Sequence, residues 1–279
     1  MKKYVNLFVF VFMVGACFSQ GKAQTKSAVS YKNPVVDIAM PDPTVIKAAD
    51  GYFYVYATES TRNVPIMKSK DLVQWTYCNT AFTNKTRPRF EPKAGIWAPD
   101  INYINNKYVL YYAMSVWGGE QTCGIGVATA NSPQGPFTDH GKMFRSNEIG
   151  VQNSIDPSFL QYEGRNYLVW GSFRGIYVIE LTEDGLSLKP GAEKKRIAGT
   201  AFEAAYIHKH GDYYYMFASI GSCCEGIRST YKVVVGRSKK VWGPYKDKSG
   251  KPMLKNGYSL VIGANNHFVG NGHGSQIIR

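Results

Sequence analysis

The sequence predicts an all-β protein with the architecture of a β-propeller, mainly because one pattern of residues recurs four times. Each copy has an acidic residue, a short apolar run, a turn, and an aromatic-rich strand that ends in a small residue. The copies are Met40–Ser60, Asp100–Ser115, Asp156–Ser172 and Glu203–Ser219. Their starts lie roughly 50 residues apart, which suits one four-stranded sheet per copy, and Tyr, Phe, Val and Ile favour strands. No segment has a helical period for more than two turns.

The outer strands of the predicted blades are also visible in the sequence. Ile125–Ala130 and Val233–Arg237 are apolar runs, and each is followed by a Gly-Pro-aromatic turn, at Gly135–Phe137 and Gly243–Tyr245. In the first blade, Lys70–Trp75 occupies the comparable place. Turns of this composition close the outer edge of a sheet.

The N-terminus has the composition of a secretory signal peptide over residues 1–23. Two lysines precede the apolar run Val5–Ala16, which is too short for a membrane span, and small and polar residues follow. Residues 14–17 also resemble a bacterial lipoprotein box that would place a lipid on Cys17, whereas cleavage near Ala23 would release a soluble protein. We favour simple secretion. The protein is therefore predicted to be secreted, periplasmic or at the cell surface of a bacterium, and at the membrane only if Cys17 is lipidated.

The chain is basic. Its formal charge of +13 falls to +10 without residues 1–23, which hold three lysines and no acidic residue. A basic, soluble surface is the simpler interpretation, and attraction to an acidic polysaccharide or an anionic envelope surface is the alternative. The sequence has no basic helix, zinc-ligand spacing or RNA-binding aromatic motif, so we exclude nucleic acid as a partner. Residues 33–279 are long enough to form one catalytic propeller domain with a sizeable core.

Four cysteines follow the predicted signal peptide, namely Cys78, Cys123, Cys223 and Cys224. In an oxidising compartment they allow three pairings, and the sequence does not choose between them. Adjacent Cys223 and Cys224 could form a disulfide with each other, and free buried thiols are an equal alternative. No CxxC or histidine spacing indicates a metal site at these cysteines.

The acidic residue in each copy points to glycosidase chemistry, because a glycosidic bond is cut by one protonated and one ionised carboxyl group. The first strand of each propeller blade lines the central channel, so acids in register would crowd one funnel and their pKa values would move apart. Glu203 lies between Phe202 and Ala204, and an apolar setting raises a carboxyl pKa, so Glu203 is the predicted general acid. Asp42 is the predicted base. Asp156 is predicted to orient Glu203 and to keep its pKa high by like-charge repulsion.

Each acid also has a purely structural interpretation. Asp-Pro at the start of a strand, as at Asp42 and Asp156, is often only a turn former, but its repetition reverses that preference. Asp100 is expected to brace the channel wall or to bind substrate. Trp97 is either a core residue or an indole on which a sugar ring stacks. We predict a substrate-binding set of Trp97, Asp100, Asn153 and Ser172.

These motifs resemble those of glycoside hydrolase family 43. The matching segments are MPDPTV, WAPD, SIDPS and FEAAYI, and the run Phe217–Tyr245 is similar to the arabinanase branch of that family. The resemblance extends from about Asn33 to the last residue and implies a five-bladed propeller that inverts the anomeric centre. It also implies that Asp42 is the base, Glu203 the acid and Asp156 the pKa modulator.

Further implications of the resemblance concern the C-terminal part of the chain. His273–Arg279 looks like the opening of a fifth blade, so that blade is predicted to be incomplete. Asn271–Ser275 resembles the family segment whose histidine faces the central channel, which implies that His273 helps to hold a hydrated calcium or sodium ion. The structural alternative is an ordinary turn residue. The sequence departs from the family at Ala204-Ala205, where Gly-Pro or Ala-Pro is usual.

The leading hypothesis is an inverting glycosidase that cleaves α-1,5-L-arabinofuranosidic bonds in arabinan. Its predicted partner is plant cell-wall polysaccharide, namely arabinan or another pentose polymer. An exo-acting α-L-arabinofuranosidase or a β-xylosidase is the nearest alternative, since the sequence does not separate endo from exo action. A retaining fructan-cleaving propeller is disfavoured because Pro41 and Ile155 stand before the two Asp-Pro pairs. From a different class, a propeller that binds pentose oligosaccharides without cutting them would need Trp97 but not Glu203.

Overall fold

The structure, a computed structural model, describes residues 31–275 together with 277 and 278. A compact unit spans Asn33–Arg279. The predicted signal peptide at residues 1–23 and the predicted lipidation site at Cys17 lie outside the described residues. Within the described part of the chain, no helix has both the length and the apolar character that crossing a membrane requires.

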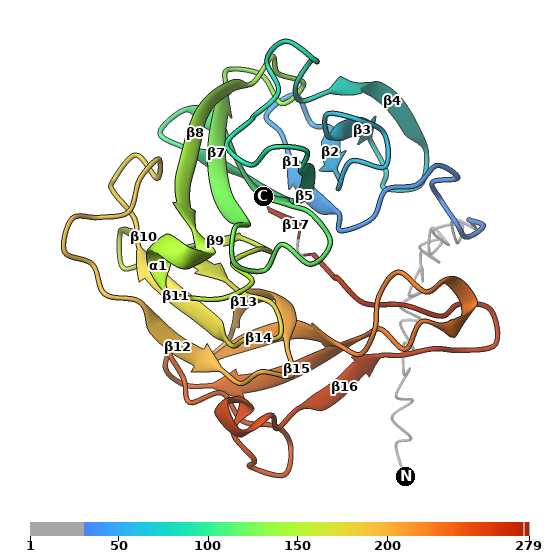
Figure 1. The fold of residues 1–279 in the computed structure, drawn as a ribbon. Helices are drawn as coiled ribbons and strands as arrows, with labels where there is room; N and C mark the ends of the chain where they lie inside the picture. The colour runs from blue at the N-terminus through green and yellow to red at the C-terminus, as the bar shows by residue number, and fades with distance from the viewer. Residues whose placement is uncertain (1–30, 276, 279) are drawn as a thin grey trace, which may run out of the picture. The chain divides into compact units, whose positions relative to one another are not determined.

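The compact unit contains four β-sheets, one for each copy of the sequence repeat (Figure 1). The first sheet holds β1 (Thr44–Lys47), β2 (Phe53–Tyr56), β3 (Pro65–Ser69) and β4 (Trp75–Thr80). The second holds β5 (Gly95–Ile104), β6 (Lys107–Ser115), β7 (Gly124–Ala130) and β8 (Thr138–Arg145). The third holds β9 (Ser158–Tyr162), β10 (Arg165–Trp170), β11 (Ile176–Glu180) and β12 (Lys195–Ala198). The fourth holds β13 (Glu203–His210), β14 (Tyr213–Ile220), β15 (Lys232–Ser238) and β16 (Ser259–Ile262).

Helical structure is confined to three single turns among the described residues. They are α1 (Ser146–Ile149) and the 3-10 turns η1 (Gly226–Arg228) and η2 (Met253–Lys255). The all-β prediction is therefore confirmed. The predicted runs Ile125–Ala130 and Val233–Arg237 correspond to β7 and β15, each the third strand of its sheet.

Within each sheet, the four strands named above form an antiparallel meander in which consecutive strands are neighbours. Tight turns enforce this order, as between β1 and β2, where Ala48 N donates to Tyr52 O at 2.8 Å. Asp50 stabilises the same turn because its Oδ1 accepts a hydrogen bond from Tyr52 N at 3.0 Å. In Figure 1 the first strand of each sheet lies toward the middle, and the fourth lies at the periphery. This is the blade arrangement of a propeller.

Apolar clusters lie between successive blades and hold them together. Ile46, Ile66 and Tyr112 belong to the cluster between the first two blades. Trp170 and the residues around it fill the space between the second and third blades, and Met216 belongs to the cluster between the third and fourth. Each cluster draws side chains from two sheets, so no blade buries its apolar face alone.

The prediction of five blades is wrong, because the structure has four. The segment that was expected to open a fifth blade instead supplies β17 (Ile277–Ile278), which pairs in parallel with β1 of the first blade. The register joins Val45 to Ile277 and Ile46 to Ile278. The inner edge of β1 offers unpaired backbone groups, and the C-terminal segment satisfies them there. The sequence repeat, with four copies, agrees with the four blades.

The core clusters predict a contrast between two leucines that both lie in strands. Leu110→Ala removes a fully buried side chain from β6, so we expect the free energy of unfolding to fall by about 2–5 kcal/mol. Leu260→Ala in β16 removes a side chain that is 58% exposed, and we expect a change within about 0.5 kcal/mol. Urea denaturation of both variants checks this. Equal losses would mean that the fourth blade is packed differently from this description.

Candidate active site

The same β-bulge lies within β5 and β13 and directly before β1 and β9, and in each bulge two residues lie opposite one residue of the second strand. The first residue of each bulge has a left-handed backbone, and these residues are Asp42 (φ 50°), Ala98 (φ 43°), Asp156 (φ 57°) and Ala204 (φ 51°). The pairing before the bulge is also shared, since Trp97 pairs with Ala113 and Glu203 with Ser219. In the other two blades, Thr58 N donates to Pro41 O and Gly171 N to Ile155 O, each at 2.9 Å.

Superposing the four bulges by register gives three layers of side chains along the channel. The layer before the bulge consists of Pro41, Trp97, Ile155 and Glu203. The bulge layer consists of Asp42, Ala98, Asp156 and Ala204. The layer after the bulge consists of Thr44, Asp100, Ser158 and Tyr206, each paired with the second strand of its blade. The four acids are therefore not in register, contrary to the expectation from the repeat, and only Asp42 and Asp156 occupy equivalent positions.

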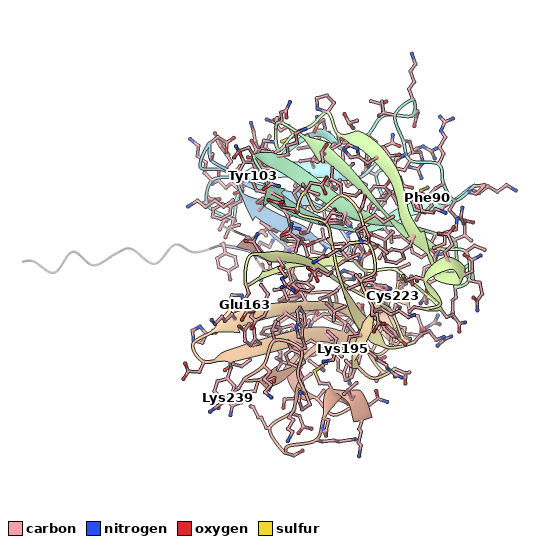
Figure 2. The ribbon with its side chains drawn as sticks, turned by 90° about the vertical axis from the view of Figure 1, so that its left-hand side faces the viewer. Phe90, Tyr103, Glu163, Lys195, Cys223 and Lys239 are labelled. Carbon is pink, nitrogen blue, oxygen red and sulfur yellow. A yellow bond between two sulfur atoms is a disulfide. The ribbon has the colours of Figure 1, made fainter. Side chains whose placement is uncertain are left out.

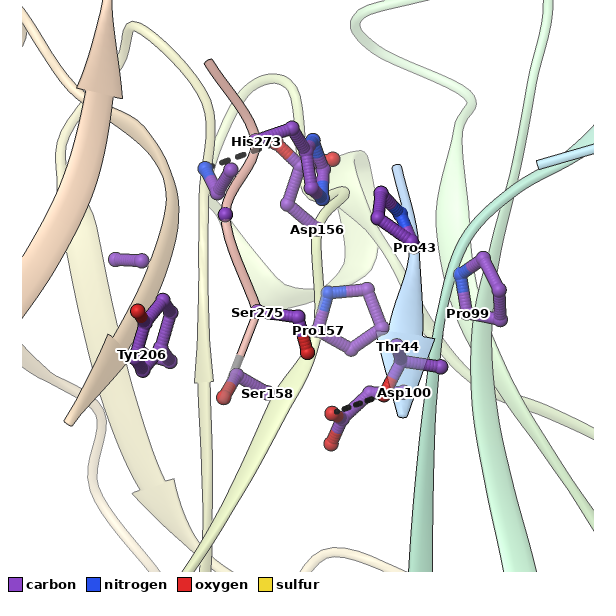
Figure 3. A pocket seen from close by; sticks show the side chains of 13 residues that line it. Pro43, Thr44, Pro99, Asp100, Asp156, Pro157, Ser158, Tyr206, His273 and Ser275 are labelled. Carbon is purple, nitrogen blue, oxygen red and sulfur yellow. Dashed lines mark hydrogen bonds between the residues drawn. The ribbon is translucent and has the colours of Figure 1, made fainter. Parts of the chain in front are cut away.

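Two cavities follow from this layering. The larger is a cleft of about 480 Å³ that contains Asp42, Asp156 and Glu203, with Trp97 on its wall. The smaller is a channel cavity of about 30 Å³, which Figure 3 shows with Asp100 beside the first residues of the inner strands. Asp156 and His273 line both cavities. The structure thus brings the three predicted catalytic carboxyl groups together and separates Asp100 from them.

Asp42 is held as a carboxylate by two partners. Thr58 Oγ1 donates a hydrogen bond to Oδ2 at 2.5 Å, and His273 Nδ1 lies 3.1 Å from Oδ1. Burial alone would raise the pKa of Asp42, but the charge and hydrogen bond of His273, helped by Thr58, lower it below the ordinary value of 3.8. Asp42 is therefore ionised at neutral pH.

His273 completes this ion pair from the C-terminal segment. Its backbone N donates to Ser219 Oγ at 2.8 Å, and its backbone is left-handed, with a φ of 51°. Burial disfavours the imidazolium form, but the negative charge of Asp42 and their hydrogen bond raise the pKa of His273 to about 9. The pair therefore places opposite charges next to each other inside the cleft.

The pKa of Glu203 is shifted in the opposite direction to that of Asp42. Its side chain is buried, with the residue only 7% exposed, and Ser172 Oγ donates to Oε2 at 2.6 Å. Burial raises the pKa of Glu203. Hydrogen bonds from Ser172 and Tyr231 and the charge of His273 oppose this rise, and the charge of Asp42 adds to it. The carboxyl group is thus more easily kept protonated than that of Asp42.

Asp156 lies between these two groups and is buried as well. Its Oδ2 accepts a hydrogen bond from Ala204 N, one residue beyond Glu203, at 3.1 Å. Burial raises the pKa of Asp156, His273 opposes the rise, and the charge of Glu203 adds to it. Asp156 therefore contacts the backbone that carries Glu203, and the repulsion between these two carboxyl groups favours the protonated form of each.

The predicted substrate-binding residues divide between the two cavities. Trp97, Asn153 and Ser172 line the cleft, and Asn153 Nδ2 donates to Ser172 Oγ at 3.0 Å. Asp100 lines only the channel cavity, where Phe159 N and Asn102 Nδ2 each donate to its Oδ2 at 2.7 Å. Burial raises the pKa of Asp100 to about 6, although these hydrogen bonds oppose the shift.

Several cleft residues were not predicted from the sequence. Thr58 and Tyr231 bind the two carboxyl groups described above, and the side chain of Trp117 packs on that of Trp97 with ring centroids 5.4 Å apart. Trp117 is 78% exposed, which is unusual for an indole and typical of a binding surface. For Thr58, a signal was available, because a hydroxyl residue follows the small residue that ends the repeat in three copies, at Thr58, Ser172 and Ser219.

The cysteine pairing that the sequence left open is resolved in part. Cys223, which Figure 2 labels, forms a disulfide with Cys224, and both residues line the cleft. Cys78 and Cys123 are free thiols. The disulfide joins neighbouring residues, so it constrains a short loop at the cleft and cross-links no distant segments.

The residues around His273 do not form a cage for a metal ion. Among the residues that the structure describes, no group of three or more His, Cys, Asp or Glu side chains is arranged to hold a cation. The Nδ1 atom of His273 is engaged by Asp42. A hydrated calcium or sodium ion held with the help of His273 stays a prediction.

Comparison with known proteins gives a consistent family assignment. Residues 31–278 match the model of the glycosyl hydrolases family 43. The chain is 38% identical over 251 residues to an extracellular endo-α-(1→5)-L-arabinanase of Bacillus subtilis, covering 85% of this chain and 76% of that protein. It is 36% identical over 262 residues to an extracellular exo-α-(1→5)-L-arabinofuranosidase of Cellvibrio japonicus, covering 84% of this chain and 74% of that protein.

Solved structures agree with this assignment. The structure of the Cellvibrio cellulosa α-L-arabinanase has a TM-score of 0.77 and 34% identity, with 85% of this chain and 82% of that chain covered. With the acid and base geometry of the cleft, these comparisons establish that the chain belongs to the glycosyl hydrolases of family 43 and is a glycosidase.

Proposed function

We propose that this glycosidase hydrolyses α-1,5-L-arabinofuranosidic bonds in arabinan. The observation that carries the proposal is the pair of carboxyl groups with opposite pKa shifts in one cleft, lowered at Asp42 and raised at Glu203. Such a pair supplies the ionised base and the protonated acid that glycoside hydrolysis needs. The choice of arabinan is supported by the activities that the names of the similar proteins state.

The proposed reaction is a single displacement at the anomeric carbon. Asp42 accepts a proton from a water molecule as the water oxygen forms a bond to that carbon. Glu203 donates its proton to the glycosidic oxygen as the bond between that oxygen and the carbon breaks. Because water attacks from the face opposite the leaving group, the anomeric configuration is inverted.

The neighbouring residues have supporting roles in this proposal. The imidazolium of His273 and the hydroxyl of Thr58 keep Asp42 ionised and fix its orientation. Asp156 orients Glu203 by holding Ala204 N, and Ser172 holds the carboxyl group of Glu203 directly. Trp97 offers an indole face for a pentose ring, and the exposed ring of Trp117 extends that surface.

An exo-acting α-L-arabinofuranosidase is the second candidate, because a protein with that name is 36% identical to this chain. The two activities share the same carboxyl chemistry and differ in whether the cleft accepts the middle of a polymer or only its end. The products therefore distinguish them.

We infer that the protein acts outside the cytoplasm on plant cell-wall arabinan. Residues 1–23 have the composition of a secretory signal, and two similar proteins are named as extracellular. Attachment through a lipid on Cys17 and residence in the periplasm are further alternatives within this proposal. A calcium or sodium ion at His273 stays a prediction, and no step of the proposed reaction depends on it.

The first prediction concerns the products of linear arabinan. Residues 24–279 should release short arabino-oligosaccharides, and Glu203→Gln should lower kcat by about 10²–10⁴-fold because it removes the general acid. Chromatography of the products from linear arabinan, branched arabinan and xylan checks this.

Glu193→Gln is the matched control, since Glu193 is exposed and lies outside the cleft. It should hydrolyse arabinan like the wild type. Release of arabinose alone would favour the exo alternative, whereas binding of arabino-oligosaccharides by the wild type without any product would contradict the proposed hydrolysis.

A second prediction concerns the pH dependence of kcat/KM. Activity should fall at low pH as Asp42 gains a proton and at high pH as Glu203 loses one. Tyr231→Phe removes a hydrogen bond that lowers the pKa of Glu203, so the alkaline limb should move to higher pH. Tyr103→Phe, at a site 55% exposed, should leave the profile unchanged. A shift of the alkaline limb to lower pH in Tyr231→Phe would argue against Glu203 as the acid.

A third prediction concerns the mature N-terminus. If the chain is simply secreted, mass spectrometry of protein from a bacterial culture should give an N-terminus near Gln24 and no lipid. A diacylated Cys17 at the N-terminus would replace simple secretion by membrane anchoring.

A further inference from the structure

A further pocket, distinct from the cleft and from the channel cavity, adjoins the cleft, and the proposed reaction does not use it. It has a volume of about 370 Å³ and is lined mainly by the loop of residues 84–94, together with Arg62 and Met114. Phe90, which Figure 2 labels, belongs to this loop. We name this feature the Arg62 pocket and define it by its charged residues Arg62, Arg87, Arg89, Glu91 and Lys93.

Two of these charges are neutralised within the protein. Arg87 forms a buried ion pair with Glu59, and both of its terminal nitrogens donate to that carboxylate. Glu91 pairs with Arg145 and so contributes no net charge to the pocket. In the described part of the chain, Arg62, Arg89 and Lys93 have no acidic side chain within ion-pair distance, so three positive charges of this pocket are uncompensated.

Asn84 orients the two uncompensated arginines. Its Oδ1 accepts a hydrogen bond from Arg62 Nε at 3.0 Å, and its backbone O accepts one from Arg89 Nη2 at 2.9 Å. Asn63 Nδ2 donates to the same Oδ1 at 3.2 Å and fixes Asn84 to the buried side of the pocket. Guanidinium groups that are held in place lose less conformational freedom when they bind an anion.

The Arg62 pocket and the cleft share a wall. Glu59 lines the cleft and binds Arg87, which lines the Arg62 pocket. Met114 lines the pocket, and Ser115, the next residue of β6, lines the cleft. The three uncompensated cations therefore lie around a pocket that adjoins the cleft across Glu59 and the end of β6.

We propose that the Arg62 pocket binds carboxylate groups of an acidic polysaccharide, of the uronate type. Arginine donates paired hydrogen bonds to a carboxylate in a planar arrangement, and two arginines with one lysine suit a chain that carries carboxylates at intervals. The common wall with the cleft of a glycosidase favours a polysaccharide over other anions. The pocket would thus hold a polysaccharide beside the cleft, and this binding does not depend on hydrolysis in the cleft.

The experiment measures the binding of oligogalacturonate by isothermal titration calorimetry, using residues 24–279. The variant Arg62→Ala/Arg89→Ala/Lys93→Ala should raise the Kd for oligogalacturonate by about tenfold or more, because each lost charge-assisted hydrogen bond contributes strongly. Raising the salt concentration should weaken the wild-type binding. The melting temperature of the variant shows whether it is folded.

The matched control is Lys248→Ala/Lys251→Ala/Lys255→Ala, which removes the same charge from exposed sites in the fourth blade. It should bind oligogalacturonate like the wild type. Equal weakening by both variants would mean diffuse attraction and would overturn the proposal, as would unchanged binding by the first. Wild-type binding to phosphatidylglycerol vesicles without binding to oligogalacturonate would assign the pocket to a membrane surface and also overturn it. Because no arabinan is used, failure here leaves the proposed hydrolysis untouched.

Discussion

The site depends on the left-handed residue that begins each β-bulge of the inner strands. A left-handed backbone is costly for residues other than glycine, and Asp tolerates it better than most. In the first and third blades this residue is an acid, so Asp42 and Asp156 enter the channel at the same height. In the fourth blade it is Ala204, and the acid is the residue before it. That one-residue offset gives Glu203 a different neighbourhood from the two aspartates.

The different neighbourhoods explain how carboxyl groups in one cleft acquire different pKa values. Isolated charges are strongly disfavoured in a buried cluster, so the cluster can hold few of them. The positive charge of His273 stabilises one carboxylate, and this carboxylate is Asp42 because His273 contacts it directly. Among the described residues Glu203 forms no ion pair, and burial outweighs the hydrogen bonds from hydroxyl groups and the more distant charge of His273 that lower its pKa. A base and an acid therefore arise from the same residue chemistry through placement alone.

Much of this could be predicted from the sequence, and the errors have physical causes. The period of the repeat correctly indicated one sheet per copy, and Asp42, Asp156 and Glu203 do meet in one cleft. When the strands are aligned by their bulges, Asp42 is equivalent to Ala98, so Asp100 lies two residues further along its strand and in the channel cavity. Aligning the repeats by their acidic residues hides this difference. The prediction of a fifth blade, which was wrong, came from the family resemblance and not from the repeat. Trp117 lies in a loop outside any periodic pattern, so no signal indicated its place.

The bulges also join the site to the packing of the blades. Thr58 lies opposite the residue before the first bulge, where its hydroxyl donates to Asp42 and accepts a hydrogen bond from Ala98 N of the second blade at 2.7 Å. Ser219 has the equivalent position in the fourth blade, and its hydroxyl holds the backbone of His273. A hydroxyl residue at this position thus orients both members of the ion pair. Thr58 binds the side chain of Asp42, and Ser219 binds the backbone N of His273. Because these bonds cross between segments far apart in the sequence, the charge pattern of the cleft forms only when the blades have assembled around it.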